Sequence, residues 1–122
     1  MIRFDDQEEG HMEISKQELD GGIVKLTLNG DLDVDGSATA DAQISSFIEK
    51  FDRIIVDLKN VDFLASAGIR VLVKSAKALA AKGGKLAIAH PNDAARRVMW
   101  TTGLEKIVPV ADDDQAAIAA VS

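Results

Sequence analysis

Ser66 lies between residues 53–58, which read as a buried strand, and an amphipathic helical pattern that begins near Ile69. A serine at a helix start can cap the helix, because its side-chain oxygen accepts hydrogen bonds from free first-turn N–H groups. A phosphate on that hydroxyl would face the same N–H groups and the positive end of the helix dipole. The sequence therefore assigns Ser66 as a helix cap, a phosphorylation site, or both.

The other residues that could do chemistry do not converge in the sequence. His11 and His90 have no partner at metal-ligand spacing, and a turn role is expected for His90, which precedes a proline. The acidic run 112–114 opens a predicted helix, where carboxylates favour the helix dipole. The phosphate-binding and dinucleotide-binding glycine motifs are absent, and residues 64–68 lack the first glycine of a nucleophile elbow. We therefore expect no enzyme activity, no cofactor and no metal.

The elements that would position Ser66 follow from periodicity. Alternating or continuous apolar runs predict strands, and apolar residues spaced three and four apart predict helices. The predicted strands are 13–19, 23–28, 53–58, 85–89 and 107–110, and the predicted helices are 37–50, 66–82, 91–102 and 112 onward. The order β-β-α-β-α-β-α-β-α predicts a small single-domain α/β fold with a mixed, mostly parallel sheet and helices packed mainly on one face.

Size and composition exclude several classes of protein. A chain of 122 residues fits one domain. A formal net charge of −6 argues against a nucleic-acid partner, and the apolar runs are too short to insert into a membrane. Residues 1–11 are acidic, so we expect a flexible N-terminus followed by one domain over 12–122. No secretion signal is visible, and no cysteine is present, so a cytoplasmic location is expected.

Three segments in this order resemble the STAS domain, specifically the bacterial anti-sigma factor antagonists. They are NGDLD at 29–33, the stretch 55–69 ending in VDFLASAGI, and the stretch 96–104 with RRVM and TGL. The resemblance covers about residues 12–121 and agrees with the predicted order of elements.

In that family the loop before the helix usually reads Asp-Ser-Ser-Gly or Asp-Ser-Thr-Gly, and its first serine is phosphorylated. Ser66 falls on that serine and Gly68 on the glycine, whereas Ala65 replaces the aspartate and Ala67 the second hydroxyl residue. Asp33 matches an acidic residue that lies near the serine in that fold. An ordinary loop carboxylate is an equally good interpretation of Asp33.

The resemblance implies partner switching. The unphosphorylated protein would bind an anti-sigma factor that is a serine kinase, and phosphorylation of Ser66 by that kinase would release it; a serine phosphatase is a further implied partner. The implied partner-binding residues are Asp31, Asp33, Ala65, Ala67, Gly68, Ile69 and Arg70. Arg70 can equally be a solvated helix charge.

A second function stays open. STAS domains also serve as constitutive accessory or scaffold subunits, for example in lipid-transport ATP-binding-cassette complexes, without phosphoregulation. The changed neighbours Ala65 and Ala67 favour this alternative. Away from the loop, Trp100 is expected to pack at the end of its helix.

Overall fold

The computed structural model describes residues 12–122, and the expected flexible segment 1–11 lies outside the described residues. A five-stranded sheet forms the centre, in the order β2-β3-β4-β5-β6. β2 pairs antiparallel with β3, and the other neighbours pair in parallel. The strands are β2 (Glu13–Leu19), β3 (Ile23–Asn29), β4 (Arg53–Asn60), β5 (Lys85–Ala89) and β6 (Val110–Ala111). The predicted mixed, mostly parallel α/β fold is confirmed.

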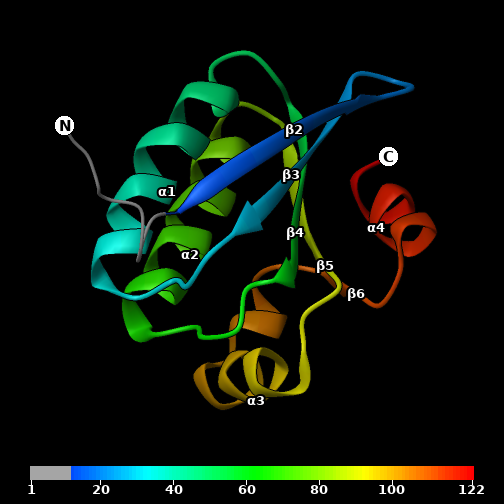
Figure 1. Ribbon diagram of the computed structural model, residues 1–122. Helices are drawn as coiled ribbons and strands as arrows, with labels where there is room; N and C mark the ends of the chain where they lie inside the picture. The colour runs from blue at the N-terminus through cyan, green and yellow to red at the C-terminus, as the bar shows by residue number, and fades with distance from the viewer. Residues whose placement is uncertain (1–11) are drawn as a thin grey trace, which may run out of the picture.

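Helices lie on both faces of the sheet (Figure 1). α1 (Val34–Ile48) and α2 (Ser66–Ala81) run side by side on one face, with their N-termini at the same end. α4 (Asp114–Val121) covers the opposite face, and α3 (Asp93–Thr102) packs at one end. No helix within residues 12–122 combines the length and apolar character that a membrane span requires.

The residues of β4 explain why both faces are covered. Ile54, Val56 and Leu58 are fully buried in the larger core beneath α1 and α2. Ile55 points to the other face, where it packs in a smaller core with Ala117 of α4. Burial of consecutive apolar residues is the pattern expected for a strand covered on both sides.

Several element boundaries differ from the sequence prediction. α1 begins at Val34, three residues before the predicted start, because Asp33 caps it. α3 begins at Asp93 because Asn92 caps it. The predicted strand 107–110 is wrong over most of its length: a 3-10 turn over Leu104–Lys106 precedes it, and only Val110–Ala111 form a strand.

Candidate functional site

The loops that precede α1 and α2 are joined to one another. Leu32 and Leu64 form an isolated parallel bridge. The Leu32 N–H donates to Phe63 O at 2.9 Å, and the Ala65 N–H donates to Leu32 O at 3.0 Å. This pairing fixes the first turns of the two helices next to each other.

Ser66 does not cap its helix, so that part of the prediction is wrong. The N-cap position belongs to Ala65, whose extended backbone (φ −92°, ψ 173°) is that of a cap but whose methyl group makes no hydrogen bond. Ser66 is the first residue of α2 and its side chain is exposed. The hydroxyl is therefore accessible for modification.

The carboxylate of Asp33 caps the N-terminus of α1. Its Oδ1 accepts a hydrogen bond from the Gly36 N–H at 2.7 Å, as in a side-chain N-cap. Asp31 is exposed on the same loop. A Cβ on Gly36 would lie 2.0 Å from Asp31 O, so the close packing of this loop against α1 requires glycine there.

The remaining predicted site residues differ in exposure. Gly68 is buried, and a Cβ on it would lie 2.7 Å from Leu32 Cβ, so this glycine lets α2 approach the loop before α1. Ala65, Ala67 and Ile69 are half-buried, and Arg70 is exposed. Contact of any of these residues with a partner stays a prediction.

The sequence missed a groove between α1 and α2. It has a volume of about 370 Å³ and is lined by Val34, Ser37, Ala38 and Asp41 of α1 and by Ala67, Arg70, Val71 and Lys74 of α2. Val34 is 74% exposed, and Lys74 Nζ pairs with Asp41 Oδ2 at 2.9 Å. The predicted start of α1 at residue 37 excluded Val34 from the helix and so from the site.

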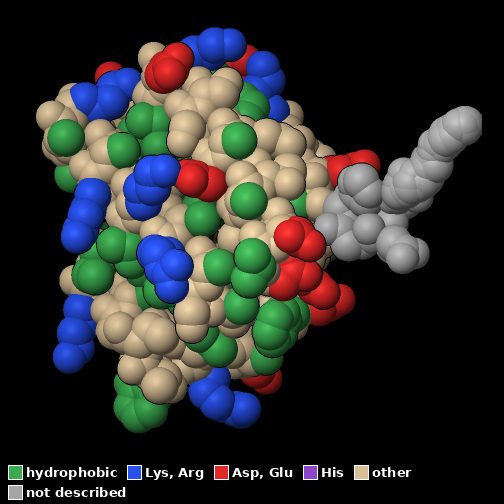
Figure 2. Space-filling model, turned by 90° about the vertical axis from the view of Figure 1, so that its left-hand side faces the viewer, with side chains coloured by type: hydrophobic (Ala, Val, Ile, Leu, Met, Phe, Trp, Pro, Cys, Tyr) green, Lys and Arg blue, Asp and Glu red, His purple; other side chains and the backbone are tan. Residues whose placement is uncertain are grey.

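Ser66 lies in a second groove, between α2 and α3. This groove has a volume of about 310 Å³ and is lined by Ser66, Ile69, Arg70, Val73 and Thr102. Arg70 lines both grooves. Figure 2 shows the face that carries α1 and α2: hydrophobic side chains gather in its lower half, with basic groups toward one side and acidic groups toward the other.

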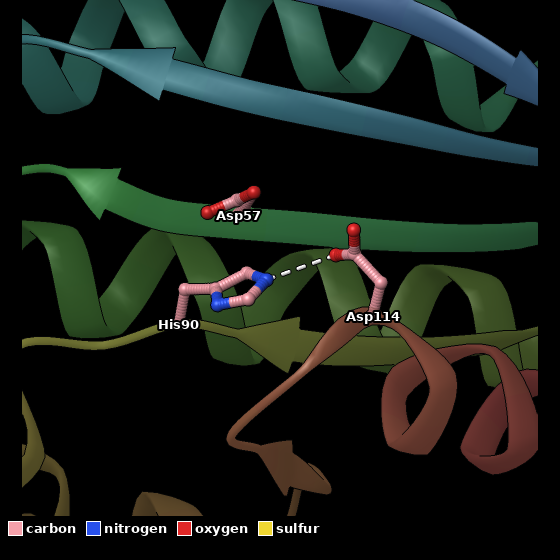
Figure 3. A group of neighbouring side chains, drawn as sticks. All are labelled: Asp57, His90 and Asp114. Carbon is pink, nitrogen blue, oxygen red and sulfur yellow. Dashed lines mark hydrogen bonds and ion pairs between the residues drawn. The ribbon is translucent and has the colours of Figure 1, made fainter.

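The fold brings together three potential metal ligands that the sequence separates. One ligand atom each of Asp57, His90 and Asp114 lies within 4.8 Å of the others (Figure 3). Lys25 Nζ, however, lies 3.4 Å from Asp114 Oδ2 and 3.7 Å from the buried Asp57 Oδ2. Lys59 Nζ lies a further 3.8 Å from Asp57 Oδ2. The two ammonium groups offset the charge of the two carboxylates, and a metal ion at this place would have to compete with them.

The same cluster attaches α4 to the end of β5. His90 Nε2 lies 2.9 Å from Asp114 Oδ1, and the His90 backbone has a positive φ of 56°. The hydrogen bond with His90 lowers the pKa of Asp114 against the opposing effect of desolvation, and Lys25 lowers it further. These contacts favour a structural charge cluster.

Trp100 does not pack at its helix end as expected. Its side chain is 75% exposed on α3, where Arg96, Arg97 and Glu105 share a shallow surface with it. Arg96 is paired with Asp112. The sequence contained a signal for this exposure, because Trp100 lies off the apolar stripe of the helix.

The chain is similar in sequence to a known domain family and to curated relatives. The model of the STAS domain matches residues 14–117. An anti-sigma F factor antagonist of Paenibacillus polymyxa is 30% identical over 99 residues, which are 80% of this chain and 85% of the relative.

Two solved structures share the fold. The crystal structure of an anti-sigma factor antagonist from Mycobacterium paratuberculosis superimposes with a TM-score of 0.83 at 23% identity, covering 93% of this chain and 97% of that one. The Bacillus cell fate determinant SpoIIAA in its phosphorylated form has a TM-score of 0.67 at 22% identity, covering 88% and 97%. The architecture of this chain is therefore that of these proteins.

Proposed function

This chain belongs to the STAS domain family, and we propose that it is an anti-sigma factor antagonist that switches partners through phosphorylation of Ser66. The observation that carries the proposal is the exposed Ser66 hydroxyl on the first turn of α2, in the groove beside α3. The relative from Paenibacillus polymyxa bears the antagonist name, and SpoIIAA has been solved in a phosphorylated form.

In the unphosphorylated state the partner docks on the surface around Ser66. The groove between α1 and α2 offers the exposed side chain of Val34 and the small side chains of Ala38 and Ala67 to an apolar group. Arg70 supplies a positive charge beside both grooves. Apolar anchors surrounded by polar groups are typical of protein interfaces.

Phosphorylation weakens docking locally. A phosphate adds about −1.5 to −2 charges at neutral pH. Asp31 on the joined loop and Asp35 in the first turn of α1 already make this end of the molecule acidic. Burying the added charge against a partner costs desolvation energy, whereas the first turn of α2 accommodates an anion, since no side chain caps it. The fold stays unchanged and the complex is lost.

The proposed partners are an anti-sigma factor serine kinase, which binds the domain and modifies it, and a serine phosphatase, which resets it. In this role the domain acts in the cytoplasm by binding rather than by catalysis, and it needs neither nucleic acid nor membrane insertion.

A second candidate is a constitutive accessory subunit, for example of a lipid-transport ATP-binding-cassette complex. Ala65 and Ala67, which flank Ser66, favour it, because neither offers a carboxylate or hydroxyl for recognition by a kinase. In this role the loop would contact a fixed partner. Stable co-purification with an ATP-binding-cassette subunit, without phosphate on Ser66, is the result that supports it.

The experiment that tests the first candidate is an intact-mass measurement after incubation with ATP and each serine-kinase anti-sigma factor of the source organism. We expect one added phosphate that Ser66→Ala abolishes and Ser46→Ala, at an exposed serine on α1, leaves in place. Absence of phosphate with every kinase, or its persistence in Ser66→Ala, would refute regulation at Ser66.

Docking of the anti-sigma factor is tested separately, by placing a charge in the groove between α1 and α2. Val34→Asp puts a carboxylate at the first position of α1, where the helix dipole favours it, so the fold is retained. We expect at least a tenfold loss of affinity for the anti-sigma factor. Thr39→Asp adds the same charge at an exposed position of α1 outside the groove lining and serves as the matched control. Equal binding by the two variants would exclude the groove as the docking surface.

A further inference from the structure

Arg70 is the cation that both grooves share. It lines the groove toward α1 together with Lys74, and the groove toward α3 together with Ser66. Lys74 is held by Asp41 through contacts of 2.9 and 3.1 Å. Within residues 12–122, by contrast, no ion pair or side-chain hydrogen bond holds the exposed Arg70 guanidinium. Among the described residues, therefore, nothing competes with an anion for Arg70.

The helix geometry directs Arg70 toward Ser66. The two residues are four positions apart on α2, so their Cβ atoms are about 5–6 Å apart on one side of the helix. Side chains of a helix lean toward its N-terminus, and the long arginine side chain therefore extends over the turn that carries Ser66. An oxyanion on the Ser66 hydroxyl would lie within its reach.

We propose that the Arg70 guanidinium binds the phosphate group when Ser66 is phosphorylated, a proposal that rests on the function proposed above. When the γ-phosphoryl group of ATP is bonded to Ser66 Oγ, the bond to ADP breaks and the hydroxyl proton leaves to solvent. The new phosphate then captures the Arg70 guanidinium through paired charge-assisted hydrogen bonds, for which arginine is suited.

This capture changes the docking surface in both grooves. In the unphosphorylated protein, Arg70 is available to a carboxylate of the partner. After phosphorylation, the same guanidinium is held at Ser66, so the surface loses a cation in addition to gaining an anion. The partner is accordingly a protein that places an acidic side chain next to an apolar anchor at this surface. Arg70 thus adds to the loss of affinity that the charge of the phosphate itself causes.

The test installs phosphoserine at position 66 by genetic code expansion and follows its ³¹P resonance in a pH titration. The Arg70 guanidinium favours the doubly charged form of the phosphate. The titration midpoint of the phosphoserine protein with Arg70 in place should therefore lie a few tenths of a pH unit below that of the phosphoserine protein carrying Arg70→Gln, as expected for a solvent-exposed pair. Arg70→Lys should fall between them. Lys74→Gln, whose native lysine is held by Asp41, should match the wild-type background.

Equal midpoints for the wild-type background and Arg70→Gln would overturn the proposal, as would an equal displacement in Lys74→Gln. Thermal unfolding of each variant verifies that the exposed substitutions leave the fold intact. Because the phosphate is installed without a kinase, the result is independent of which partner modifies Ser66. A negative titration therefore refutes the role of Arg70 alone, whereas a negative phosphorylation assay refutes the proposed function.

Discussion

Replacing Ala65 by aspartate should stabilise the protein by supplying a cap that α2 lacks. The other three α-helices of residues 12–122 are capped by side chains: Asp33 Oδ1 accepts from Gly36 N at 2.7 Å, Asn92 Oδ1 from Ala95 N at 2.7 Å, and Asp113 Oδ1 from Ala116 N at 2.8 Å. α2 has no side-chain cap.

The backbone of Ala65 is already arranged for a cap. Its φ of −92° and ψ of 173° resemble the −74° and 175° of Asn92, so the new side chain needs no change of the loop. The equivalent donor, the Gly68 N–H, already donates to Ala65 O at 2.9 Å. The gain therefore falls in the lower part of the range for caps, about 0.5–1 kcal/mol. For a domain of this size, that gain corresponds to a rise in Tm of roughly 2–4 °C.

Urea and thermal unfolding of three variants would separate the hydrogen bond from the charge. Ala65→Asp and Ala65→Asn both provide a cap oxygen, and only the first adds a charge near the helix dipole. Ala67→Asp places the same charge at the second residue of α2, two positions after the cap, where it cannot cap the helix, and is the matched control. If Ala65→Asn gives no gain and the two aspartate variants gain equally, only the dipole effect operates and the capping argument is wrong.

Three further predictions concern packing, pH dependence and the exposed surface. Gly68→Ala should lower the free energy of unfolding by about 1–3 kcal/mol in urea, because the new Cβ would lie 2.7 and 2.8 Å from two leucine side-chain atoms; an unchanged midpoint would contradict the packing. The pKa of Asp114 is lowered by its hydrogen bond with His90, so its stabilising contribution is present above the ordinary value of 3.8 and is lost as the pH falls through the lower folded value. Asp114→Asn should therefore have a lower free energy of unfolding than the wild type at pH 6, and this difference should shrink toward pH 2. The difference is small because Asp114 is half-exposed. A difference that stays constant with pH would refute the link between the pKa of Asp114 and stability. Trp100→Ala should change stability by less than about 0.5 kcal/mol, and acrylamide should quench the fluorescence of Trp100 in the folded protein nearly as well as that of free indole; a shielded indole would contradict its 75% exposure.

Local patterns in the sequence determined the elements and the placement of Ser66. The continuous apolar run 54–56 predicted a strand covered on both faces, and its residues are fully buried. Gly83 after Lys82 marked the end of α2, where the glycine adopts a φ of 80°. Strand periodicity and left-handed glycine conformations are properties of a few neighbouring residues, so sequence alone reveals them.

The exact start of each helix and the contents of the site depended on the tertiary structure. Leu32 and Leu64 join the two loops, the cap position of α2 falls on Ala65, and Ser66 is exposed as the first residue of the helix. The fold also placed Val34 beside Arg70 in one groove, and Asp57 beside His90 on the far face of the sheet. The sequence by itself determined which residues could form strands, helices and a modifiable serine. Only the tertiary structure decided which of them meet, because those contacts join residues tens of positions apart and depend on how the helices pack on the sheet.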